Sequence, residues 1–125
     1  PRFAILEHTW RGTHWDLLLE VEGALKAWAL SAFPTVGEVV EARALSDHRL
    51  VYLDYEGPIS GDRGSVRRVD RGQFSVISWG HNEVVVVLAG EKLKGPMRLR
   101  LEGSGMGGNC RETGEGWRAL LGNRD

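Results

Sequence analysis

Three side chains near the N-terminus, His8, His14 and Asp16, have the types and the spacing of a metal site. Residues two apart in a β-strand point to the same side, so His14 and Asp16 would project together. His8 lies an even number of residues before both, and Gly12 can bend the path between them. Two imidazoles and one carboxylate commonly hold Mn²⁺, Zn²⁺ or Fe²⁺ and leave positions open for water and substrate. The same spacing also fits surface or capping residues.

His48, followed by Tyr52 and Tyr55, is the next candidate for chemistry. A histidine beside a metal can act as a general acid or stabilise a phosphoryl oxygen. The alternative is a loop histidine whose hydrogen bonds are satisfied locally. His81 has the pattern of a turn residue, and Cys110, the single cysteine, has no neighbouring histidine, so we interpret it as structural or incidental.

Glycines divide the chain into short segments, which is typical of strands joined by turns. Glu22-Gly23 and Asp70-Arg71-Gly72 have the pattern of hairpin turns. The range 36–45 fits either a strand or a short helix, and the Gly-rich range 103–116 is expected to be a mobile loop. The expected strands cover residues 3–6, 14–21, 24–30, 64–69, 73–79, 84–88, 97–101 and 117–121.

The 125 residues fit one domain, residues 1–125, with one core. About eight strands with little helix predict a mostly β fold, a small closed or nearly closed antiparallel β-barrel. Such a barrel would bring the early strands and the His48 region onto one scaffold.

Composition limits the function classes. The net charge of −1 argues against tight non-specific binding to nucleic acid, but it allows an enzyme that grips one terminal phosphate. No apolar run approaches membrane-spanning length, and the N-terminus has no signal pattern. A single cysteine agrees with a reducing compartment. We therefore expect a cytoplasmic location and no membrane partner.

Several sequence blocks occur in the order of a known family. This chain has His8-Thr-Trp-Arg-Gly-Thr-His14-Trp-Asp16-Leu-Leu18-Leu-Glu20. That block resembles the His, five residues, and then His-x-Asp-x-Arg-x-Glu of the 3′-phosphoesterase domain of bacterial DNA ligase D. Further matching blocks are Glu22-Gly23-Ala24-Leu25-Lys26-Ala27-Trp28-Ala29, Asp47-His48-Arg49-Leu50-Val51-Tyr52-Leu53-Asp54-Tyr55-Glu56-Gly57, Gly90-Glu91-Lys92-Leu93-Lys94-Gly95 and Trp117-Arg-Ala-Leu-Leu121. Their order across almost the whole chain is more specific than any single block.

The resemblance implies roles for individual residues. His8, His14 and Asp16 would hold a divalent ion, with Mn²⁺ expected and Zn²⁺ as the alternative. His48 would contact the phosphate or serve as general acid, with Tyr52 as a hydrogen-bonding neighbour. In the family this chemistry removes a ribonucleotide or a phosphate from a DNA or RNA–DNA 3′ end during DNA repair. Ligase and polymerase subunits on separate chains would then be partners.

Several residues of the family pattern that would bind phosphate are replaced in this chain. Its Arg in His-x-Asp-x-Arg is Leu18, which has no charge to clamp phosphate oxygens. Leu6 replaces a Gln, Ser46 replaces an acidic residue, and Ser31-Ala32-Phe33 replaces Pro-Lys-Gly. The arginines that would substitute are Arg11, Arg49 and Arg63, and ordinary solvated side chains are the alternative interpretation of all three.

Three hypotheses remain open. The first is a divergent metal-dependent phosphoesterase that acts on nucleic-acid 3′ ends. The second is a catalytically impaired metal-binding module that binds DNA ends or repair partners. The third is a small-molecule oxygenase on a cupin-like barrel, which the absence of a His-x-His pair disfavours.

Overall fold

The structure, a computed structural model, describes residues 1–102 and 114–123. Its strands are β1 (Arg2–Thr9), β2 (Thr13–Val21), β3 (Ala24–Leu30), β4 (Val39–His48), β5 (Gly57–Pro58), β6 (Ser65–Trp79), β7 (Glu83–Gly90), β8 (Lys94–Leu101) and β9 (Trp117–Leu121). One short 3₁₀ helix, η1 (Leu50–Leu53), follows β4 in the described chain. The predicted mostly β class is confirmed. Cys110 and most of the expected 103–116 loop lie outside the described residues.

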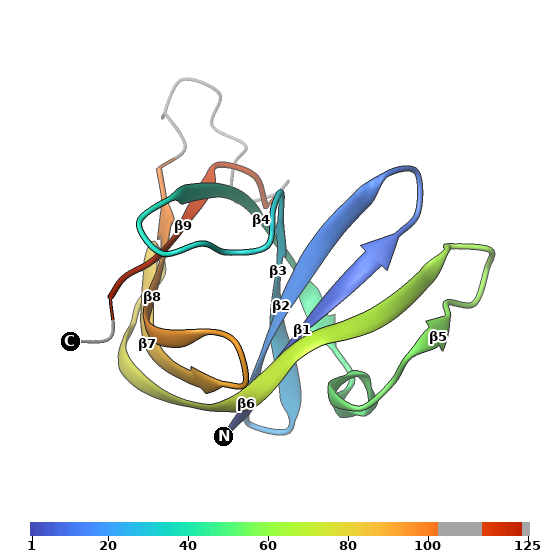
Figure 1. The fold of residues 1–125 in the computed structure, drawn as a ribbon, viewed down its shortest axis with the longest axis horizontal. Helices are drawn as coiled ribbons and strands as arrows, with labels where there is room; N and C mark the ends of the chain where they lie inside the picture. Colours follow the sequence, from blue (N-terminus) through green and yellow to red (C-terminus); the bar gives the residue numbers. More distant parts are fainter. Residues whose placement is uncertain (103–113, 124–125) are drawn as a thin grey trace.

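All strand pairs in the described sheet are antiparallel, in the order β1-β2-β3-β4-β9-β8-β7-β6-β5. A further pairing of β1 with β6 links the two sides of the sheet. Over the described residues, eight strands therefore form a ring that is nearly, but not quite, a closed barrel (Figure 1). This agrees with the expected nearly closed barrel.

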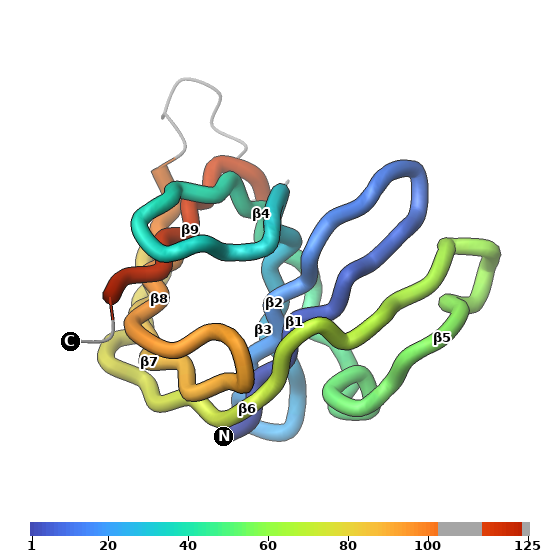
Figure 2. The backbone as a smooth tube through the Cα atoms, in the orientation of Figure 1, coloured from blue at the N-terminus to red at the C-terminus, as the bar shows by residue number. Residues whose placement is uncertain are grey.

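The sheet buries apolar side chains on both faces. Inside the ring, Phe3, Ile5, Leu17 and Leu19 pack with residues of the distant strands, such as Met97. A second cluster lies outside the ring, where the chain between β4 and β6 passes over β1 (Figure 2). Its buried members are Ala4, Leu6, Leu18, Leu25, Ala27, Leu53 and Val66. Alternate residues of β1 and β2 therefore serve two separate cores, because successive side chains point to opposite faces.

The hairpin expected at Asp70-Arg71-Gly72 is wrong. These residues lie inside one long strand, β6, whose first part pairs with β1 and whose second part pairs with β7. The Asp70 carboxylate is buried and accepts backbone N–H bonds from Glu91, Lys92 and Leu93, at 2.9–3.0 Å. Asp70 thus caps the β7–β8 turn instead of forming a turn of its own.

The turn expected at Glu22-Gly23 is confirmed. Both residues have positive φ, 50° and 83°, as a two-residue hairpin turn with right-handed twist requires. The ambiguous segment after Gly37 is a strand, β4, and not a helix. Among the described residues, no helix has the length and apolar character needed to cross a membrane.

Candidate metal centre and its clefts

The hairpin of β1 and β2 brings His8, His14 and Asp16 together on the outer face of the ring. His8 and His14 are direct cross-strand partners, and Asp16 follows His14 by two residues on the same face of β2. His8 Nδ1 lies 3.2 Å from His14 Nε2, and His14 Nε2 lies 3.0 Å from Asp16 Oδ1. One potential ligand atom from each residue falls within 4.8 Å of the others. The geometry suits three ligands around one ion.

A backbone hydrogen bond fixes the orientation of His8. Its Nε2 lies 2.9 Å from the carbonyl oxygen of Arg63, which can only accept a hydrogen bond. Nε2 therefore carries the proton, and Nδ1 keeps its lone pair toward His14 and Asp16. Ligating histidines usually donate their other ring N–H to such a carbonyl. The loop before β6 thus holds His8 in the orientation that a metal ligand would need.

Asp16 supplies an independent test of whether a cation fits. The residue is only 4% exposed, and its Oδ1 is buried without a hydrogen-bond partner in the described chain. A buried carboxylate oxygen without a partner costs free energy unless a cation or a donor compensates it. His14 Nε2 lies 3.0 Å from this Oδ1, and His8 Nδ1 lies 3.8 Å from the other carboxylate oxygen, Oδ2. A nitrogen and oxygen donor set of this kind suits Mn²⁺ or Zn²⁺. The residues present fit a divalent cation.

A cleft of about 250 Å³ connects this triad with the segment after β4. His8 and Asp16 line one side, and His48 and Tyr52 line the other. His48 Nδ1 donates a hydrogen bond to the Ser46 carbonyl oxygen at 2.9 Å, which leaves the Nε2 lone pair unshared. The His48 and Tyr52 rings meet edge to face, with centroids 5.8 Å apart. The structure therefore brings the histidine and the tyrosine singled out in the sequence to the same cleft as His8 and Asp16.

The three candidate phosphate-binding arginines occupy different environments. Arg49 and Arg63 line the His48 cleft. The Arg63 guanidinium, however, donates to the Ser60 carbonyl and hydroxyl oxygens within its own loop. Arg11 stacks over the Trp10 ring, 4.9 Å from its centroid, and does not line the described cleft. Arg49 is therefore the best placed of the three beside His48.

Comparison with known proteins agrees with this arrangement. Residues 6–100 match the family model of the DNA ligase D 3′-phosphoesterase domain. The chain belongs to the DNA ligase D 3′-phosphoesterase family.

Relatives include the multifunctional non-homologous end joining protein LigD of Pseudomonas aeruginosa, 33% identical over 110 residues, and that of Mycolicibacterium smegmatis, 32% identical over 114 residues. The LigD protein of Mycobacterium tuberculosis is 32% identical over 106 residues. Each alignment covers 78% of this chain but only 13–15% of the relative. The chain thus corresponds to a small part of each of these multifunctional proteins.

Leu18 shows how this chain departs from the pattern expected for its family. The leucine lies on the same face of β2 as Asp16, two residues farther along. It is fully buried in the outer cluster with Leu6 and Leu25. An arginine would offer phosphate oxygens five N–H donors at this position, whereas leucine contributes only packing.

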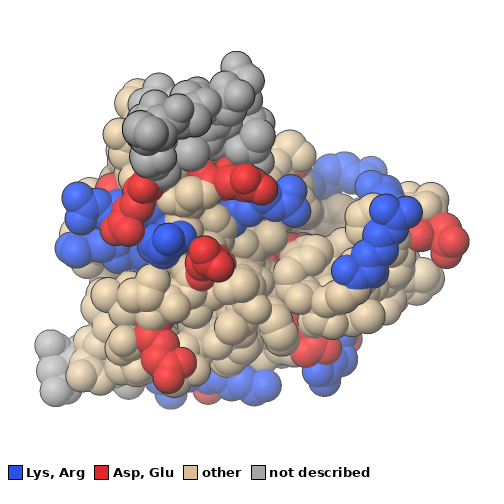
Figure 3. All heavy atoms as spheres, turned by 90° about the horizontal axis from the view of Figure 1, so that it is seen from above, with Lys and Arg blue, Asp and Glu red and all other residues tan. Residues whose placement is uncertain are grey.

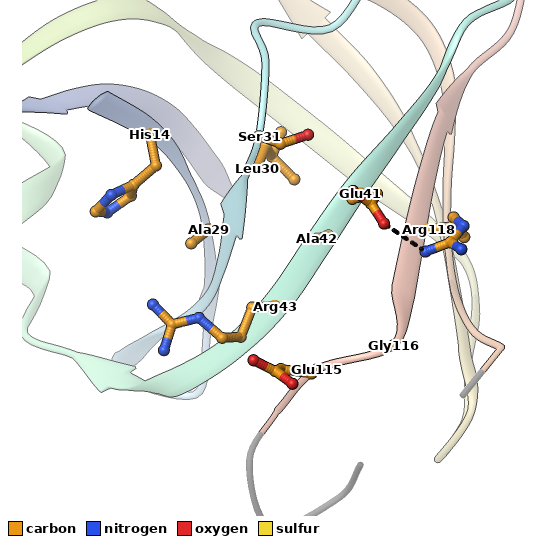
Figure 4. Close-up of a pocket in the computed structure, with 10 residues that line it drawn as sticks. All are labelled: His14, Ala29, Leu30, Ser31, Glu41, Ala42, Arg43, Glu115, Gly116 and Arg118. Carbon is orange, nitrogen blue, oxygen red and sulfur yellow. Dashed lines mark hydrogen bonds and ion pairs between the residues drawn. The ribbon is translucent and has the colours of Figure 1, made fainter. Parts of the chain in front are cut away.

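A second cleft, of about 420 Å³, adjoins the other side of the triad and was not anticipated from the sequence (Figure 4). His14 lines it together with Ala29, Arg43 and Glu115, among others. Arg43 lies in the middle of β4, in a segment without a recognisable motif. Only the strand register, which pairs Ala29 with both Asp16 and Arg43, places this arginine near the triad.

Charges elsewhere on the domain are mixed. On the face seen in Figure 3, basic and acidic side chains are interspersed over the described chain. One exposed pair, Arg2 and Asp54, joins β1 to the end of η1 with a 2.7 Å contact. The hydrogen bond from Arg2 lowers the pKa of Asp54 below its ordinary value, and the nearby positive charges act in the same direction. This contact ties the segment that carries His48 and Tyr52 to the start of β1.

Proposed function

We propose that this domain is a divalent-metal-dependent phosphoesterase that removes a ribonucleotide or a phosphate from nucleic-acid 3′ ends in DNA repair. The carrying observation is that two members of the metal-type triad of β1 and β2, His8 and Asp16, share one cleft with His48 from the end of β4. Membership of the 3′-phosphoesterase family and the end-joining relatives support the substrate class. The family match also favours this chemistry over the oxygenase hypothesis.

The residues around the cleft would have different roles in phosphate-ester hydrolysis. His8, His14 and Asp16 would hold the ion, proposed to be Mn²⁺, with Zn²⁺ as the alternative. When bound, a divalent ion polarises the phosphate and lowers the pKa of a water. His48 lines the cleft with Nδ1 anchored on the Ser46 carbonyl; once Nε2 has also taken up a proton, His48 would pass that proton to the departing oxygen. Tyr52 packs edge-on against this ring and fixes its orientation.

A catalytically impaired binding module is the second candidate, and Leu18 is the observation that favours it. Losing one preorganised contact to a reacting phosphate typically lowers the rate by about 10²–10³-fold. A domain that binds the ion and the DNA end without cutting would retain the triad and lose this contact. The two candidates differ in turnover, not in metal binding.

Cleavage of a primer–template that ends in a 3′-ribonucleotide or a 3′-phosphate, with and without Mn²⁺, tests the proposal. His8→Ala removes a ligand, and His48→Ala removes the proposed acid while leaving the triad intact. His81→Ala is the matched control, because His81 is exposed in the β6–β7 turn. We expect Mn²⁺-dependent trimming in the wild type and the control, loss with His8→Ala, and a fall of about 10²–10⁴-fold with His48→Ala.

Measurable Mn²⁺ binding without trimming of either substrate would replace the enzyme proposal with the binding-module candidate. Trimming that proceeds at the same rate in the wild type and in His8→Ala would contradict the role of His8 as a metal ligand, on which both candidates rest. The 3′-hydroxyl left by trimming is the group that a ligase joins, so a ligase is the proposed partner activity, with a polymerase acting on the same end.

A further inference from the structure

Arg43 projects from the face of the sheet that carries the metal-type triad. Asp16 pairs directly with Ala29 on β3, and Ala29 pairs directly with Arg43 on β4. Directly opposed residues of antiparallel strands point to the same face. The three side chains therefore form one row across β2, β3 and β4, with a single methyl group between the carboxylate and the guanidinium.

The distance across this row is short enough for a shared ligand. Neighbouring strands lie about 4.8 Å apart, so Asp16 and Arg43 start roughly 10 Å apart. An extended arginine side chain covers much of that distance. Figure 4 shows the Arg43 guanidinium extending past Ala29 on the side where His14 lies. His14 and Arg43 line the same cleft of about 420 Å³.

The two arginines of this cleft, Arg43 and Arg118, differ in whether an acidic side chain pairs with them. Arg118 contacts Glu41, with 3.5 Å between its Nη1 and the carboxylate Oε1. Within residues 1–102 and 114–123, no hydrogen bond or ion pair engages the Arg43 guanidinium, and the side chain is exposed. The arginine is available to an incoming anion, and its planar fork suits phosphate oxygens.

We propose that Arg43 binds the terminal phosphate of a nucleic-acid 3′ end and supplies from β4 the positive charge that Leu18 does not provide on β2. The inference rests on the proposed function and adds a substrate-binding residue to it. The 3′-terminal nucleotide then lies over Ala29, between the triad and Arg43. The cleft beside His14, as well as the one beside His48, is part of the substrate site.

Binding of an uncleavable 3′ end tests this assignment separately from turnover. The probe is a fluorescent oligonucleotide with a 3′-methylenephosphonate, which has a P–C bond where the ester would be cut, compared with the same strand ending in 3′-hydroxyl. Anisotropy in saturating Mn²⁺ gives both dissociation constants. The variants are Arg43→Ala and Arg43→Lys. Arg98→Ala is the control because it removes an equal charge from an exposed strand position outside the cleft.

We expect Arg43→Ala to weaken phosphonate binding about 10–100-fold, the range for a lost charge-assisted contact. Arg43→Lys should recover part of the affinity, and Arg98→Ala should stay within about threefold, as expected for an exposed charge. Binding by the 3′-hydroxyl strand should change little in every variant.

Two results would overturn the role of Arg43: equal phosphonate affinity in Arg43→Ala and Arg98→Ala, or no preference of the wild type for phosphonate over hydroxyl. Arg43-dependent binding in a wild type that leaves a natural 3′-phosphate uncut would contradict only the proposed hydrolysis. The failure of one proposal is thus distinguishable from the failure of the other.

Discussion

Replacing His14 by alanine tests the metal centre at the residue that lies between the other two ligands. The His14 Nε2 atom is 3.2 Å from His8 Nδ1 and 3.0 Å from Asp16 Oδ1. The side chain is partly exposed, so its removal leaves no large cavity, and the β1–β2 ladder uses only its backbone. The variant should therefore fold while losing one of three ligands.

We expect Mn²⁺ to stabilise the fold of His14→Ala much less than it stabilises the wild type. At a free Mn²⁺ concentration 100 times the dissociation constant, binding stabilises the wild-type fold by about 2.7 kcal/mol. For a domain of this size that corresponds to a rise in Tm of roughly 10 °C. If the missing ligand lowers affinity about 100-fold, only about 0.4 kcal/mol remains at the same concentration. The rise in Tm should then fall to about 1–2 °C.

Thermal unfolding by circular dichroism, with Mn²⁺ and with chelator, measures this difference. His81→Ala, which changes an exposed histidine in the β6–β7 turn, should keep the full rise and so controls for weak binding to surface imidazoles. A folded His14→Ala protein that Mn²⁺ stabilises as much as the wild type would refute the ligand assignment.

Three further predictions concern the surrounding structure. Asp70→Ala leaves three backbone N–H groups of the β7–β8 turn without their acceptor, and urea unfolding should show a loss of about 3–5 kcal/mol. Leu18→Ala should cost about 2–5 kcal/mol by the same assay yet leave Mn²⁺ affinity unchanged in calorimetry, because Leu18 is a core residue. Because Arg2 lowers the pKa of Asp54, this pair stabilises the fold above the ordinary carboxyl pKa, and its contribution is lost as pH falls through the lowered value. NMR titration of Asp54 should show the low pKa, and Arg2→Gln should return it toward normal.

Local patterns predicted most of the strands but not the long-range role of Asp70. The Glu22-Gly23 turn was predictable because positive φ at both central residues is a property of the turn itself. Asp70-Arg71-Gly72 carries a similar signal, yet it is the interior of β6. The Asp70 carboxylate satisfies donors more than twenty residues away. A contact between residues so far apart in the sequence cannot be predicted from a local pattern.

The candidate site likewise contains residues that local spacing predicts and residues that only the folded arrangement brings together. His14 and Asp16 were predicted to lie together because their spacing matches the strand period. Arg43 could not be associated with them, since its position depends on the register of β3 against both neighbouring strands. The outer cluster that buries Leu18 was equally hidden, because it forms only when the chain after β4 covers β1 and β2.

The three candidate ligands all belong to one hairpin, while His48, Tyr52 and Arg43 come from other parts of the chain. The candidate ligands therefore come from one short, contiguous unit, with His8 oriented by the Arg63 carbonyl, whereas the surfaces that would meet the substrate depend on β4 and the segment that follows it. Under the proposed function, mutations in those distant segments would change which ester is accepted while the hairpin keeps its candidate ligands. The proposed function would thus place the residues that hold the ion and the residues that select the substrate in different parts of the chain, so that one hairpin could serve domains of different specificity.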